Sequence, residues 1–175
     1  MSFPLTQPPP RYVRLHPDRA RHIRSRCAAV GVPLSVAAGA LVVVIIVAGL
    51  RLPTARDPFN SLVWAVGAAA ALCGFLATLG LAGARPYVVN DHLDLNGARV
   101  TRRVLGAVWT CTTVVSAFTC LLFVLLVTSG RSATKGIAFA GWAWAYLAAL
   151  ALPAVLSGIA FFTARALFRP AVRLW

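Results

Sequence analysis

Residues 28–50 read AAVGVPLSVAAGALVVVIIVAGL, an apolar run without one charged side chain. A helix needs about 20 such residues to cross roughly 30 Å of hydrocarbon. Three further uncharged runs follow at about 61–84, 104–128 and 136–164. The sequence therefore predicts an all-α integral membrane protein, in which a bundle of four transmembrane helices occupies residues 28–164.

The composition of the whole chain agrees with a membrane protein. Its 175 residues are 59% hydrophobic and 12% charged, whereas soluble domains are about 45–50% apolar and about 25% charged. The net charge of +13 comes almost entirely from arginine, since Lys135 is the single lysine, a bias expected of a GC-rich bacterial genome. The arginines flank the apolar runs and accompany no aromatic-basic RNA motif. We therefore expect membrane contacts and no nucleic-acid partner.

Arginine and lysine also predict the orientation of the spans, because short loops that carry them stay on the cytoplasmic side. Six basic residues precede the first span, four lie between the second and third, and three follow the fourth. The other two loops carry two each. We therefore expect both termini in the cytoplasm, with the protein in the plasma (inner) membrane of a high-GC bacterium.

Two basic segments flank the predicted bundle. Residues 1–27 form a cytoplasmic segment rich in proline and arginine, in which Pro17 and Asp18 mark a helix start. Residues 165–175 form a basic amphipathic tail expected along the inner leaflet, with Pro170 interrupting the helix. Each basic residue near anionic lipid contributes about 1 kcal/mol. The candidates for such contacts are Arg19, Arg24, Arg26, Arg102, Arg103, Arg165, Arg169 and Arg173.

Two predicted helix faces carry small or hydroxyl side chains. At about 100° per residue, a narrow stripe in 61–84 consists of Gly67, Ala71, Gly74 and Thr78. About a third of the circumference of 104–128 carries Thr112, Thr113, Ser116, Thr119 and Cys120. Small residues let helices approach closely in lipid, and hydroxyls bond to carbonyls of their own or another helix. We expect both faces to pack helices, with a partner-subunit face and a polar permeation path as the respective alternatives.

The loop between the second and third spans, RPYVVNDHLDLNGARVTRR at residues 85–103, holds two of the four acidic residues. Within it, Asn96-Gly97 favours a two-residue type I′ turn. That turn would pair Asp94 with Arg99 across a short cytoplasmic β-hairpin, where opposite charges stabilise the pairing. A protein partner docking on this ribbon is the function that we expect of the loop, if it has one.

The same loop resembles metal-binding segments only in part. HLDLNG resembles the start of a calcium loop, but His92 occupies the first ligand position and Arg103 the last, where a bidentate glutamate belongs. Asp91, His92 and Asp94 could hold a transition metal only with further ligands that the loop does not supply. We therefore predict no metal and no cofactor.

Side chains that carry membrane chemistry are missing from the interiors of the predicted spans. No ionisable residue lies there, although proton-coupled carriers and small four-helix multidrug carriers depend on one. All three histidines lie outside the spans, which disfavours haem ligation in the bilayer. No C-x-x-C pair, phosphate loop or nucleophile elbow is present. We predict no catalytic residues.

These features together favour a non-catalytic accessory or assembly subunit of a larger membrane complex. Its partners would be anionic membrane lipids and other integral membrane subunits, or further copies of itself. The alternative is a homo-oligomeric pore or small-solute transport protein lined by Thr112, Ser116 and Thr119. A third alternative is an enzyme that acts on lipid headgroups, for which Asp91, His92 and Asp94 are the available acid-base groups.

Overall fold

Four long helices and a small sheet make up residues 12–51, 58–89, 91–128 and 142–172, the part of the chain that this computed structural model describes. The helices are α1 (Pro17–Arg51), α2 (Pro58–Ala82), α3 (Leu95–Thr128) and α5 (Trp142–Val172). Each contains a segment long and apolar enough to cross a membrane. The predicted helical membrane protein with four spanning helices is confirmed at this level.

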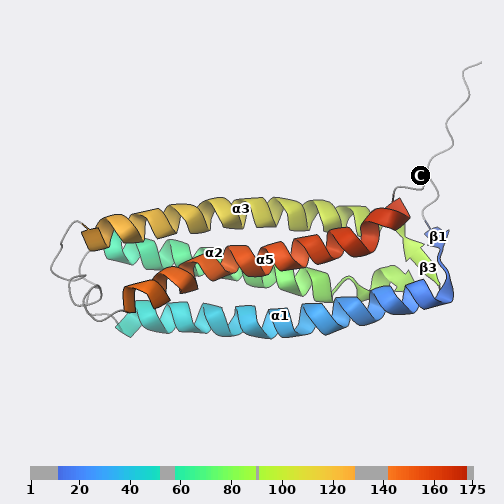
Figure 1. The fold of residues 1–175 in the computed structure, drawn as a ribbon, viewed down its shortest axis with the longest axis horizontal. Helices are drawn as coiled ribbons and strands as arrows, with labels where there is room; N and C mark the ends of the chain where they lie inside the picture. Colours follow the sequence, from blue (N-terminus) through green and yellow to red (C-terminus); the bar gives the residue numbers. More distant parts are fainter. Residues whose placement is uncertain (1–11, 52–57, 90, 129–141, 173–175) are drawn as a thin grey trace, which may run out of the picture.

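The helices form an elongated bundle with the sheet at one end (Figure 1). α1 and α3 run away from the sheet, and α2 and α5 return toward it. α2 and α5 contact each other as well as both remaining helices, whereas α1 and α3 share no comparable contact. α2 and α5 therefore occupy the short diagonal of the bundle, with α1 and α3 as its two flanks.

The sheet contains three short antiparallel strands, β1 (Tyr12–Arg14), β2 (Val88–Val89) and β3 (His92–Asp94), in the order β1-β3-β2. A 3₁₀ turn, η1 (Arg85–Tyr87), connects the end of α2 to β2. Leu93 of the central strand β3 lies opposite Val13 on one side and Val88 on the other. Because Leu93 is fully buried, it fixes the sheet against the helices.

The turn predicted at Asn96-Gly97 is wrong. Both residues lie in the first turn of α3, which begins at Leu95. The chain instead reverses between β2 and β3, where Asp91 has a positive φ of 65°. A Cβ atom at Gly97 would collide with the ring of Tyr87, so this glycine allows close packing on a helix. Asp94 and Arg99 consequently do not face each other across a ribbon.

The largest buried apolar cluster lies where the sheet meets the helix ends. It includes Ile23 of α1, Leu81 of α2, Leu93 of β3, Leu105 of α3 and Phe168 of α5. We call this cluster, together with the sheet, the cap. Two smaller clusters, around Leu150 and around Ile45, fill the bundle farther from the sheet.

Both segments expected to flank the bundle extend its helices instead. α1 is continuous from Pro17, and its residues Ala20 and Cys27 are buried in the cap. α5 continues past Pro170 to Val172, so the expected interruption at that proline is wrong. The buried Phe168 anchors this last part of α5. Residues 1–11 and 173–175, which include Arg173, lie outside the described residues.

Candidate functional site

The acidic residues of the loop have local structural roles. The N–H of Leu15 donates a hydrogen bond of 2.6 Å to the carbonyl oxygen of Asp91, which ties the entry to α1 to the β2–β3 turn. The carboxylate of Asp94 accepts a hydrogen bond of 3.0 Å from the N–H of Asn96, as expected of an N-cap residue. Asp94 thereby begins α3, and among the described residues it makes no ion pair with Arg99.

Asp91, His92 and Asp94 do not converge on a common point. His92 is exposed on β3 opposite Arg14 and Val89. In the described part of the chain, no group of three histidine, cysteine or acidic side chains could hold a metal ion. The four cysteines are free thiols, of which only Cys27 is fully buried.

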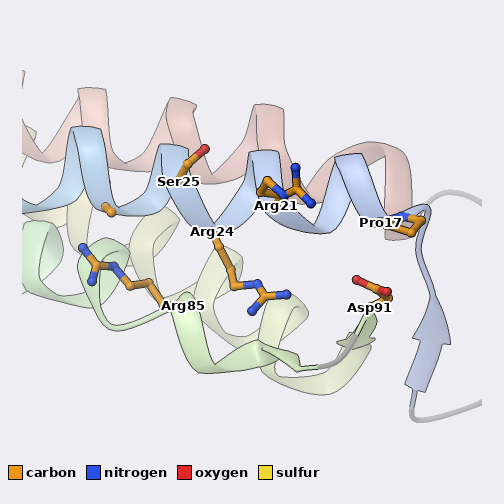
Figure 2. Close-up of a pocket in the computed structure, with 7 residues that line it drawn as sticks. Pro17, Arg21, Arg24, Ser25, Arg85 and Asp91 are labelled. Carbon is orange, nitrogen blue, oxygen red and sulfur yellow. The ribbon is translucent and has the colours of Figure 1, made fainter.

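A cleft of about 610 Å³ opens between the start of α1, η1 and the β2–β3 turn. Its charged lining residues are Arg21, Arg24, Arg85 and Asp91, and Figure 2 shows Arg24 lying between Arg85 and Asp91 in this view. The three arginines are exposed and make no hydrogen bond or ion pair with other described residues. We call this hollow the basic cleft.

Backbone geometry brings these arginines together. Arg21 and Arg24 are three residues apart on α1 and therefore share a face. Arg85 opens η1, where the backbone bends directly after α2 beside that face. A guanidinium presents its donors in a planar fork suited to phosphate or carboxylate oxygens. The basic cleft can thus bind an anion at the level where the apolar part of α1 begins.

The other arginines expected to touch lipid surround the same end of the bundle. Arg19, Arg26, Arg103 and Arg165 are exposed, and Arg102 is half-buried. Arg19 and Arg26 lie on the side of α1 opposite Arg21 and Arg24, since their positions differ from these by about half a turn. The sequence predicts lipid contacts for Arg19, Arg24 and Arg26 alike, but in the structure Arg24 lies on the other side of α1 from Arg19 and Arg26.

The small-residue stripe of α2 lies inside the bundle. Gly67, Ala71, Gly74 and Thr78 are all buried. A Cβ atom at Gly67 would lie 2.6 Å from the side chain of Leu150, and one at Gly74 would lie 3.1 Å from the backbone oxygen of Pro153. Both neighbours belong to α5, so the stripe is occupied by an intramolecular contact between α2 and α5.

The hydroxyl residues of α3 divide into two groups. Thr112, Ser116 and Thr119 are at most 2% exposed, whereas Thr113 is exposed. Thr112 and Thr119 each donate a hydrogen bond of 2.7 Å to a carbonyl one turn earlier in α3, and Cys120 makes a long contact of 3.9 Å with the carbonyl of Leu147. The buried hydroxyl of Ser116 has no hydrogen-bond partner among the described residues.

This placement bears on the pore alternative. A pore on the axis of an oligomer needs lining side chains on the outside of each bundle. Thr112, Ser116 and Thr119 instead face the interior of a single chain. Their burial gives a homo-oligomeric pore no lining from these residues.

Two members of the basic cleft, Arg21 and Arg85, were not among the predicted site residues. The spacing of Arg21 and Arg24 was visible as one helix face. Arg85 joins them only because α1 lies beside the end of α2, which no local pattern specifies.

The chain was compared with models of protein families, with curated proteins and with solved structures. None of these comparisons finds a match.

Proposed function

We propose that the chain is a non-catalytic accessory or assembly subunit of a larger membrane complex, and that a partner helix packs on the outward face of α3. The observation that carries this proposal is the chemistry of that face. Small or polar side chains are exposed there between the larger Val104, Val114 and Phe118, namely Ala107, Thr110, Cys111, Thr113 and Ala117. Helix interfaces in membranes are enriched in such residues.

The outward face of α1 differs from that of α3 in exposing no hydroxyl within residues 28–50. Its exposed residues toward the far end are Val43, Val44, Ile46, Val47 and Leu50, side chains suited to contact with lipid. Among the described residues, the exposed hydroxyls within the apolar segments, Thr110, Thr113 and Thr128, all belong to α3. Each donates a hydrogen bond to a carbonyl of its own helix, so the face can pack closely without leaving a donor unpaired.

For the same chain we propose a location in a bacterial plasma membrane with the cap and both termini in the cytoplasm. Apart from Arg51 at the far end of α1, the arginines of α1, η1, α3 and α5 belong to the cap end of the bundle. Such a concentration of arginine supports a cytoplasmic cap through the positive-inside rule.

Site-specific photocrosslinking in the native membrane tests the subunit proposal. A photoreactive residue at Thr113 or Ala117 should give one adduct of defined mass, whose partner peptide mass spectrometry can identify as a transmembrane segment. The same residue at Val36 or Val43, which are also exposed, serves as the control and should label mainly lipid. Equal adducts from both helices, or lipid adducts alone from α3, would refute the proposed face.

A further inference from the structure

Two hollows lie end to end along the junction of α1 and α2. The first is the basic cleft. The second is an apolar groove of about 410 Å³, lined by Val32, Val36 and Gly39 of α1 and by Phe75, Leu79 and Ala82 of α2. We call it the apolar groove.

The two hollows follow the same faces of both helices. On α1, Arg24, Ala28, Val32 and Val36 line them in steps of four residues, which places them on one inclined row of the helix surface. On α2, Leu79 and Ala82 line the apolar groove, and Arg85 of the basic cleft follows three residues later. The hollows therefore form one path from the charged level of the protein into its apolar part.

Close packing at the base of this path gives it its shape. A Cβ atom at Gly31 would lie 2.8 Å from the backbone of Ala82, and one at Gly39 would lie 3.4 Å from the ring of Phe75. The two helices thus pack closely beneath the hollows, because glycine at both positions leaves room for the neighbouring helix. The only hydroxyl of the apolar groove, that of Ser35, donates a hydrogen bond of 2.7 Å to the carbonyl of Gly31.

The chemistry changes sharply along the path. The basic cleft presents three arginines that make no hydrogen bond or ion pair with other described residues, and one carboxylate, that of Asp91, so its net charge favours an anion. The apolar groove presents aliphatic side chains and one aromatic ring, with its one hydroxyl satisfied. A ligand that fits both parts has an anionic head and a hydrocarbon tail.

The dimensions of the path match one leaflet of a bilayer. Val32 and Ala40 bound the apolar groove on α1, and eight residues of helix rise by about 12 Å. Half of a hydrocarbon core of about 30 Å is about 15 Å. Arg24 precedes Val32 by eight residues, which places its backbone about 12 Å further toward the cap, with a side chain long enough to reach the interface.

We infer that the junction of α1 and α2 is a binding site for one anionic phospholipid. The phosphate binds in the basic cleft to Arg21, Arg24 and Arg85, and an acyl chain lies in the apolar groove. This inference is independent of the proposed partner on α3, because the two surfaces belong to different flanks of the bundle.

Lipid titration followed by native mass spectrometry of the purified full chain in mild detergent tests the head-group half of the site. Wild-type protein should retain one phosphatidylglycerol in preference to phosphatidylcholine. R21Q/R24Q should weaken phosphatidylglycerol binding by about 25-fold, at about fivefold per arginine. The matched control is R19Q/R26Q, which removes the same charge from the opposite face of the same helix and should bind like wild type. Equal loss in both variants would reduce the effect to general surface charge and overturn the site.

A second pair of variants tests the acyl half. Ala40 lines the apolar groove, whereas Ala37, which is also exposed, does not. A40W should therefore lower phosphatidylglycerol retention severalfold, and A37W should leave it unchanged. Soluble glycerol phosphate should compete weakly with the lipid. Competition as strong as that of the lipid, or a dimer that phosphatidylglycerol does not displace, would overturn the assignment. An unchanged thermal midpoint in each variant confirms that the fold is intact.

Discussion

At the scale of single residues, two glycines cannot be replaced by a larger residue without a steric conflict with a neighbouring group. Gly31 allows the backbones of α1 and α2 to meet, and Gly97 lies beneath the ring of Tyr87. Glycine elsewhere in a helix is a cost of about 1 kcal/mol relative to alanine. Substitution by alanine should therefore lower stability where a neighbouring group occupies the space of the Cβ atom, and raise it where that space is free.

The first prediction compares Gly31 with Gly80. G31A should destabilise the bundle by about 1–3 kcal/mol, because the new Cβ atom meets backbone that cannot move aside alone. At Gly80, which is exposed, the nearest atom is a flexible end of Leu105 at 3.4 Å. G80A should gain up to about 1 kcal/mol of helix propensity. Unfolding midpoints in mild detergent measure both changes, and a stabilising G31A would contradict the close contact of α1 with α2.

The second prediction concerns Gly97 and Tyr87. G97A should lower stability by about 1 kcal/mol because the ring must shift, and the loss should shrink when Tyr87 is also replaced by alanine. A double-mutant cycle measures this coupling. Additive effects would show that Gly97 is needed for its backbone conformation, as in the turn that the sequence predicted, and not for contact with Tyr87.

At the scale of secondary-structure elements, the cap depends on the strand that is central in the sheet. Leu93 of β3 is fully buried, whereas Val89 of the edge strand β2 is 56% exposed. Leu93 lies between both neighbouring strands and within the apolar cluster of the cap. Its replacement should therefore loosen the cap without disturbing the apolar spans.

The third prediction follows from this contrast. L93A should cost about 2–5 kcal/mol of local stability through the cavity that it leaves, and V89A should cost little. Hydrogen exchange at Tyr12–Arg14 and trypsin cleavage after Arg14 should both increase in L93A, while the helical circular dichroism of the spans persists. Protection equal to wild type in L93A would show that β1 does not depend on β3.

The elements differ in how far the sequence could predict them. The spans follow from uncharged apolar runs, which are a local property. The start of α3 was missed, although Leu95, Ala98 and Leu105 follow a helical spacing and are all buried. Asn96-Gly97 is a strong local turn signal, but the N-cap at Asp94 and the packing of Tyr87 on Gly97 outweigh it. Neither contact of the folded chain can be read from the tetrapeptide around that turn.

The same distinction applies to the candidate site. Arg24 was expected to contact lipid, and the structure places it in the basic cleft with Arg21 and Arg85. Arg85 is distant in sequence, so its proximity depends on the pairing of α1 with α2. The lining of a cleft built from two elements is a property of tertiary packing and not of composition.

At the scale of the whole molecule, charge and shape are arranged along the same axis. The cap end carries the arginine-rich starts of α1 and α3 and the end of α5, and the uncharged parts of all four helices follow. A bundle with this arrangement has one energetically preferred direction in a membrane.

The fourth prediction tests that direction. In a cysteine-free background, a cysteine at Ser25 beside the basic cleft should react with a membrane-impermeant maleimide only after cell lysis. A cysteine at Ser132 should react in intact cells, because the sequence places it between the third and fourth apolar runs and the proposed orientation puts that segment outside. The reverse labelling would invert the proposed orientation, and labelling of both in intact cells would exclude it.

The strand order also bears on how the chain is made. β1 is synthesised before α1, but its neighbour in the described sheet is β3, which is synthesised after α2. The first strand therefore pairs only once two helices have been threaded in opposite directions and the chain has returned to its starting side. If α2 failed to insert, β3 would be left across the membrane from β1. During biosynthesis, this small sheet can therefore be completed only when the first two helices have crossed the membrane in opposite directions.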